Sequence, residues 1–196
     1  FIGNRIGVFS ILASIHHTAE FGLGFDEVDA ISGPLIGRPK SATYRTSGVV
    51  GLDTMAHVIK TLQDNLGPVG GGDTGKVEDP FSDIYGTPPV LAKLLEAKSL
   101  GQKTGAGFYR KTKTGIERFD PQHDAYVASG EKGNDVYTRM LKKPASERLQ
   151  LLRNAEGEQG QFLWAILRNS FHYAAVHLKD IADNARDVDL AMRWGF

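Results

Sequence analysis

The chain of 196 residues contains no cysteine, which excludes disulfides, thiolate nucleophiles and cysteine metal sites. It also has no excess of charge, because 23 basic residues balance 23 acidic ones and neither sign is concentrated in one stretch. This balance argues against a nucleic-acid groove or an anionic membrane surface as the main partner. No apolar run is long enough to span a bilayer. What remains is the composition of an ordinary soluble globular protein.

The chain does not begin with methionine but with Phe1, and it stops at Phe196 in the middle of a helical pattern. We therefore expect a piece of a longer protein, with one or two domains in the part given. No signal peptide is recognisable, which carries little weight for a chain without its first methionine. Our expectation is a cytoplasmic protein from a bacterium.

Residues 1–20 are predicted to form a long buried helix. Glycine and serine recur along it at steps of four, three and four, at Gly3, Gly7, Ser10 and Ser14. Such a strip without bulky side chains allows another backbone to approach closely. Apolar residues spread over most of the remaining circumference, as in a central helix. They are Ile6, Val8, Phe9, Ile11, Leu12, Ile15 and Ala19.

Periodicity and capping signals predict further helices. They cover residues 26–31, 55–66, 90–98 and 145–152, the sequence from 161 onward, and 187–192. Residues 40–50 are mostly polar, and we predict that they form a loop. Residues 111–160 lack a pattern outside 145–152, so we predict a linker with one helix.

The last part of the chain repeats the first. A shift of 160 positions places Ile6 on Ile166 and His17 on His177, and the pair Val28-Asp29 on Val188-Asp189. In both places a long apolar helix precedes a short acidic one. This shared order predicts a duplicated helical unit. Asn4, however, falls on Trp164.

Two motifs suggest a phosphate-binding loop and a metal site, but the residues around them do not support either. Residues 70–76 have the glycine and lysine spacing of a Walker A loop, but Val77 replaces the Mg²⁺-binding Ser or Thr and no hydrophobic strand comes before. The adjacent His16 and His17 point about 100° apart on a helix, so we expect that they cannot share a metal ion. The sequence predicts no metal site.

Four stretches together resemble the C-terminal helical domain of the 3-hydroxyacyl-CoA dehydrogenases of fatty-acid β-oxidation. They are Phe1-Ile2-Gly3-Asn4-Arg5, Glu27-Val28-Asp29, the segment from Gly37-Arg38-Pro39 to Thr54, and the segment from Gly101 to Tyr109. The resemblance implies an all-α fold of the 6-phosphogluconate-dehydrogenase C-terminal type. Residues 1–110 would be a first copy, 111–160 a linker, and 161–196 the incomplete start of a second copy, as in the long multifunctional members.

The resemblance also implies a reaction, the oxidation of an L-3-hydroxyacyl-CoA to the 3-ketoacyl-CoA with hydride transfer to NAD⁺. In this family NAD binds to an N-terminal Rossmann domain that also holds a catalytic His–Glu pair, and both are absent from this chain. We therefore expect the chain alone to be inactive. The implied partners are the acyl-CoA substrate, the chain's own Rossmann domain, a second copy in a homodimer or pseudo-dimer, and a fused enoyl-CoA hydratase.

Asn4 matches the family's asparagine beside the catalytic histidine and the substrate oxygen. Its amide suits that role, because it can donate to an oxygen that gains charge or can hold an imidazole tautomer. Without the resemblance, a helix cap would be the preferred reading of Asn4. Arg38, Pro39 and Lys40 lie on a turn near the family's acyl or pantetheine pocket and are candidates for substrate binding. Solvated loop charges are the preferred alternative for Arg38 and Lys40.

Two other functions fit the sequence. One is a non-catalytic helical association module, in which the small-residue strip and the apolar helix faces pair subunits or repeats. The other is the helical domain of a related hydroxy-acid dehydrogenase that does not use CoA. The segment from Lys103 to Tyr109 argues against the second.

Overall fold

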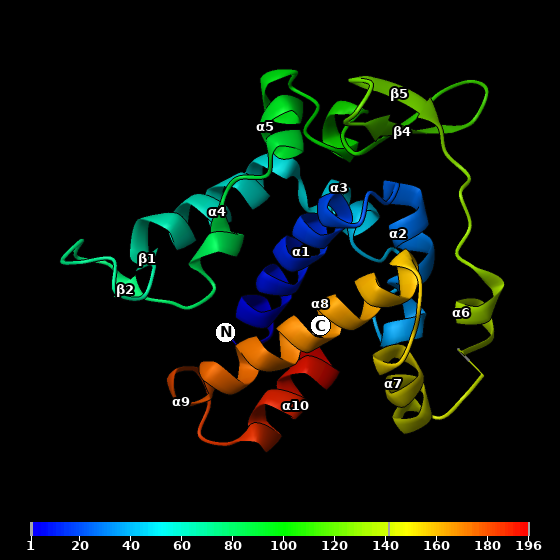
Figure 1. Ribbon diagram of the computed structural model, residues 1–196. Coiled ribbons are helices and arrows are strands. Elements are labelled where there is room, and N and C mark those ends of the chain that lie inside the picture. The colour runs from blue at the N-terminus through cyan, green and yellow to red at the C-terminus, as the bar shows by residue number, and fades with distance from the viewer. Residues whose placement is uncertain (1, 141, 196) are drawn as a thin grey trace.

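The computed structural model describes residues 2–140 and 142–195, and it is mostly helical (Figure 1). Phe1, at the start of the first predicted helix, and Phe196, at the end of the predicted second copy, lie outside the described residues. In chain order the helices are α1 (Ile2–Glu20), α2 (Phe25–Ile31), α3 (Tyr44–Val50), α4 (Leu52–Asn65), α5 (Pro89–Glu96), α6 (Asp135–Met140), α7 (Ala145–Arg153), α8 (Glu158–Val176), α9 (Leu178–Ile181) and α10 (Ala185–Gly195). The 3₁₀ turns are η1 (Pro34–Ile36), η2 (Ser82–Tyr85) and η3 (Gln102–Thr104). In the described part of the chain, no helix combines the length and the hydrophobicity that crossing a membrane requires.

Helix α1 is the buried centre of the fold, as the sequence predicts. Phe9, Leu12 and Ile15 are at most 3% exposed, and each buried side chain of this size contributes about 1.5–3 kcal/mol relative to an exposed one. The ring of Phe9 stacks on that of Tyr173 in α8, with centroids 4.0 Å apart, and meets Phe81 edge to face. Figure 1 shows α8 (orange) running next to α1 (blue).

The strip of small residues on α1 allows this close approach. Ser10 Oγ lies 2.8 Å from Ser170 Oγ of α8, and Ser14 Oγ donates to the carbonyl of Ser10 at 2.7 Å. The side chain of Arg38 also reaches the strip. Glycine and serine leave room here for a second helix and for a guanidinium.

Helix α3 replaces most of the loop predicted for residues 40–50. Its N-terminal backbone is capped by a distant carboxylate, that of Asp29 in α2. Asp29 Oδ1 accepts from the amides of Thr43 at 3.0 Å and Tyr44 at 2.8 Å, and Oδ2 accepts from Arg45 at 3.0 Å. The prediction was wrong because this capping residue stands 14 to 16 positions away in sequence.

The prediction of a helical fold is confirmed in its main part, because most of the described residues are helical, but it missed an antiparallel sheet. It consists of β3 (Tyr109–Lys111), β4 (Ile116–Asp120) and β5 (Ala125–Ala128), paired in that order. Phe119 of this sheet is buried, and its ring packs edge to face on Tyr126. Arg118, next to it in the strand, pairs with the buried Asp26 of α2 at 2.8 Å. The strands are short, carry several charged residues and show no regular alternation of apolar and polar residues, so the segment was easily taken for a polar linker. A parallel pair, β1 (Leu66–Gly67) and β2 (Val77–Glu78), flanks the glycine-rich loop.

Residues 111–160 hold more than the single helix predicted, since they contain α6, α7 and the first residues of α8. Helix α7 lies where we expected it, and α6 is additional. The short α6 depends on the burial of Tyr137 and Met140 and on Asn134, whose Oδ1 accepts from the amide of Val136 at 2.9 Å. The division of the chain into two copies and a linker stays a prediction.

Candidate functional site

Asn4 lies in the first turn of α1, and its side chain is exposed. The helix begins at Ile2, so Asn4 is already helical and does not occupy the N-cap position, which precedes the first helical residue. Helical steps of three and four place Gly7 and Ile11 on the same face of α1. The structure thus presents an amide to solvent at one end of this face.

The same face continues into a cavity of about 220 Å³. Gly7 and Ile11 line it from α1, and Pro39 and Thr46 line it from the turn before α3 and from α3 itself. Pro39 and Lys40 are exposed on that turn. The structure therefore places Pro39 beside the face of α1 that carries Asn4, although neither Asn4 nor Lys40 is among the residues that line the cavity.

Arg38 is not the solvated loop charge that the sequence favoured. Its guanidinium turns inward, where Nη1 donates to Ser14 Oγ at 3.2 Å and to Thr43 Oγ1 at 3.1 Å, and Nη2 donates to the hydroxyl of Ser10. No ion pair of Arg38 exists among residues 2–140 and 142–195. Burial lowers the pKa of Arg38 to about 10, so the group stays charged at neutral pH.

Asp29 joins three of the four stretches on which the family resemblance rests. Besides capping α3, its Oδ2 accepts from the hydroxyl of Tyr109 at 3.0 Å. Burial raises the pKa of Asp29 to about 6, against the opposing effect of the four hydrogen bonds. This single carboxylate therefore fixes α2, the start of α3 and the strand β3 relative to one another.

Glycines in the fourth stretch allow a close approach of backbones. Gly101 has a φ of +105°, and a Cβ at this position would overlap the carbonyl oxygen of Gly48 at the end of α3. A Cβ on Gly107 would in turn lie 2.8 Å from Gly101 Cα. Larger residues at these positions would push the stretch away from α3.

A polar network next to Asn4 was missed by the sequence analysis. Arg5 Nε donates to the hydroxyl of Tyr173 at 3.0 Å, and Arg5 Nη2 lies 3.3 Å from His177 Nδ1. On its other side, His177 Nε2 lies 3.0 Å from Oδ2 of the buried Asp79, which also accepts from Tyr85 at 2.9 Å. These partners stand up to 172 positions apart, so no local pattern in the sequence could indicate them. They fix the first turn of α1 to the end of α8.

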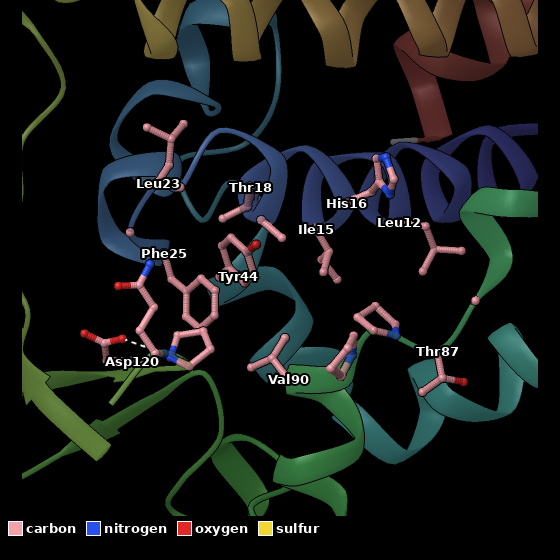
Figure 2. A pocket seen from close by; sticks show the side chains of 18 of the residues that line it. Leu12, Ile15, His16, Thr18, Leu23, Phe25, Tyr44, Thr87, Val90 and Asp120 are labelled. Carbon is pink, nitrogen blue, oxygen red and sulfur yellow. Dashed lines mark hydrogen bonds between the residues drawn. The ribbon is translucent and has the colours of Figure 1, made fainter. Parts of the chain in front are cut away.

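The largest cavity described, about 520 Å³, lies beside a later part of α1 (Figure 2). Leu12, Ile15 and His16 line it from α1, and Val90 and Asp120 lie on the opposite side in the figure. These α1 residues begin more than two turns after Asn4. The cavity is therefore separate from the face that carries the candidate amide.

The two adjacent histidines come closer together than the sequence argument allowed. Ligand atoms of His16, His17 and Glu20 all lie within 4.8 Å of one another, so adjacency on the helix does not prevent a shared ion. Both ring nitrogens of His17 nevertheless have protein partners, with Nδ1 2.6 Å from Glu20 Oε2 and Nε2 2.8 Å from the amide of Asn169. The geometric reason given for excluding a metal was wrong, but the contacts favour a structural role for His17.

We expect His17 to make the stability of the chain depend on pH. Burial lowers the pKa of His17, with smaller contributions in the same direction from His16 and Arg168 and an opposing one from Glu20. The unfolded chain therefore binds a proton more readily, so the stability that His17 contributes is present above pH 6.5 and is lost as pH falls below it. Urea unfolding at a series of pH values should show a smaller decrease for His17→Gln than for the original chain. Equal decreases would contradict this expectation.

The glycine-rich loop does not have the structure of a phosphate-binding loop. It runs from β1 to β2, and its lysine, Lys76, donates to the carbonyl of Gln63 at 2.6 Å. A Walker A loop leads from a strand directly into a helix, whose N-terminus binds the phosphates. The loop therefore does not fit a nucleotide.

Comparisons with known proteins agree with the resemblance in sequence. The family model described as "3-hydroxyacyl-CoA dehydrogenase, C-terminal domain" matches residues 1–111. A "Probable 3-hydroxyacyl-CoA dehydrogenase" of Bacillus subtilis is 36% identical over the whole chain, which covers 24% of that protein. Its namesake in Deinococcus radiodurans is 37% identical over 58% of the chain and 29% of its own length.

A more distant relative carries a composite name. The "Putative fatty acid oxidation complex trifunctional enzyme" of Rickettsia felis is 26% identical over the whole chain, which covers 25% of that protein. The chain thus spans about a quarter of the length of these curated relatives. No solved structure matches it.

Proposed function

Because the chain belongs to the 3-hydroxyacyl-CoA dehydrogenase family, whose C-terminal domain it contains, we propose that it forms the substrate-side helical part of a longer enzyme. That enzyme oxidises an L-3-hydroxyacyl-CoA of fatty-acid β-oxidation, and NAD⁺ accepts the hydride. The observation that carries the proposal is the exposed amide of Asn4 on a face of α1 that continues into the cavity beside Pro39.

In this proposal NAD binds outside these residues. The glycine-rich loop of residues 70–76 lies between two strands, and its Lys76 donates to the carbonyl of Gln63, so this loop does not fit a nucleotide. The catalytic His–Glu pair likewise belongs to the Rossmann domain. The chain's own contribution is to orient the substrate.

Asn4 is the residue to which we assign the catalytic contribution of this chain. Its NH₂ donates to the substrate oxygen as that oxygen gains negative charge, or its carbonyl holds the imidazole of the catalytic histidine in one tautomer. The network around Arg5 supports this role, because an amide can orient a reacting group only if its own helix turn is fixed. Pro39, Lys40 and the inward-facing Arg38 form the side of the site that receives the acyl or pantetheine part.

We further propose that α8 and α10 begin a second copy of the domain, of the 6-phosphogluconate-dehydrogenase C-terminal type, and that the two copies form an intramolecular pseudo-dimer. Helix α2 begins at Phe25 and α10 at Ala185, which are 160 positions apart. Ser10 and Ser170, also 160 positions apart, hydrogen-bond to each other where α1 and α8 meet. Contacts between equivalent residues are the signature of a two-fold axis.

The alternative function, a helical association module, is compatible with this arrangement, because the two copies of the enzyme's helical domain would themselves be held together by pairing of helices. The CoA-independent dehydrogenase gains no support from the contacts. A fused enoyl-CoA hydratase and a cytoplasmic location complete the proposal. The name of the Rickettsia relative supports the fusion.

We expect the 196-residue chain alone to oxidise NADH with acetoacetyl-CoA no faster than background, because it lacks the nucleotide fold and the acid–base pair. A longer chain that includes the upstream residues should turn over the same pair of substrates. The assay follows NADH absorbance with both proteins at equal concentration. Turnover by the short chain at the rate of the long one would overturn the proposal.

A further inference from the structure

A third cavity, of about 470 Å³, lies between α1, α8, α10 and the turn that carries Arg38. Its walls are mainly apolar, with Ile6 from α1, Leu167 and Phe171 from α8, and Val188 and Met192 from α10. Phe171 is 53% exposed, so the cavity opens to solvent. A volume in this range and apolar walls with few polar groups are typical of small-molecule sites.

The polar end of this cavity is the guanidinium of Arg38. Two N–H groups of Nη1 and one of Nη2 donate to the hydroxyls of Ser14, Thr43 and Ser10. A guanidinium has five N–H donors, which leaves Nε–H and one N–H of Nη2 without a partner among the described residues. Arginine N–H donors bind the two oxygens of a carboxylate.

The charge of Arg38 has no counter-ion within the described residues, since its three partners are neutral hydroxyls. Asp189 also lines the cavity but is exposed, where water screens its charge. A buried cation without an anionic partner is costly, and an anion bound in the cavity would remove that cost.

We propose that this cavity binds a medium-chain carboxylate, with its head on Arg38 and its hydrocarbon chain between α8 and α10. The apolar walls favour this ligand over a phosphate, because a phosphate needs several donors and the wall beyond Arg38 and Ser10 offers mostly carbon. This inference does not rest on the proposed function, since it requires neither a nucleotide nor the amide of Asn4. A free fatty acid and the carboxyl end of a longer acyl compound present the same chemistry.

Titration calorimetry of the 196-residue chain with decanoate, below its micellar concentration, tests the proposal. We expect saturable binding of one decanoate per chain. Methyl decanoate, which has the same tail without the charge, should bind at least ten times more weakly. Decanedioate monomethyl ester, which models the carboxyl end of a longer acyl compound, should bind like decanoate, and its failure to bind would leave the free fatty acid as the ligand. Decanoyl-CoA, whose carboxyl group is a neutral thioester, should bind at least ten times more weakly. Equal affinity for decanoate and methyl decanoate, or stronger binding of inorganic phosphate than of decanoate, would overturn the proposal.

Variants of the protein test separately the binding of the carboxylate group and of the hydrocarbon chain of decanoate. Arg38→Met should weaken decanoate binding at least tenfold, Arg38→Lys should restore part of it, and Lys60→Met on the exposed side of α4 should leave it unchanged. Ala174→Phe, which fills the cavity without touching the guanidinium, should also abolish binding of decanoate. Circular dichroism and thermal melting show whether each variant is folded. A folded Ala174→Phe variant that binds decanoate normally would place the ligand elsewhere and refute the inference.

Discussion

In the longer enzyme, Asn4→Ala is expected to lower kcat by about one to three orders of magnitude, the range seen when a hydrogen-bond donor to a developing oxyanion is removed. The donor acts on the oxygen as it gains charge in the transition state, so kcat should fall more than KM rises. Steady-state assays with acetoacetyl-CoA and NADH at saturating concentrations measure this. The side chain of Asn4 is exposed, so the free energy of unfolding should change little.

Asn65→Ala provides the matched control, because this exposed asparagine lies at the end of α4, where its Nδ2 donates to the carbonyl of Thr61. Its kcat should stay within about twofold of the original, because no contact links it to the face of Asn4. If kcat of Asn4→Ala is unchanged as well, Asn4 has a structural role only. If the variant instead loses stability, the lost kcat cannot be assigned to the reaction.

Asp29→Ala is expected to lower the free energy of unfolding of the 196-residue chain by roughly 3–5 kcal/mol. The substitution leaves three backbone N–H groups at the start of α3, and the hydroxyl of Tyr109, without their acceptor. Asp29 is 4% exposed, so water cannot fully replace the carboxylate. Because a domain of this size has about 5–15 kcal/mol in total, the variant should still fold but unfold at a much lower urea concentration.

Asp64→Ala is the comparison for this loss. Asp64 is likewise a carboxylate with a partner on the protein, Lys60, but both side chains are more than half exposed. An exposed pair of this kind on one helix contributes about 0.3–0.5 kcal/mol. If Asp29→Ala costs no more than Asp64→Ala, the carboxylate does not hold α2, α3 and β3 together, and the resemblance in these three stretches needs another explanation.

The sequence by itself determined the elements whose stability depends on neighbours within one or two turns. The central helix was predicted with its end at Glu20, because its apolar circumference and its strip from Gly3 to Ser14 are both formed by residues close together in sequence. Family membership was equally accessible. The residues that carry it, Asp29 and Gly101 among them, meet geometric needs that few other side chains satisfy.

Tertiary structure alone decided the features whose partners are far apart in the chain. Helix α3 is stabilised by the carboxylate of Asp29, which caps it from an earlier helix, and the sheet is stabilised by the burial of Phe119 in the core. Neither segment shows a sustained periodic pattern of apolar residues. The orientation of Arg38 could not be predicted from the sequence either. An arginine on a polar turn is expected to be exposed to solvent, and only the fold shows that Ser10 and Ser14 of α1 accept its hydrogen bonds. Contacts between Arg5 and His177 are separated by 172 positions, and only the folding of α8 against α1 brings the two side chains together. Local sequence patterns indicate where helices lie and how they are capped. Hydrogen bonds across the core depend on how distant segments pack together, which the sequence of one segment does not indicate.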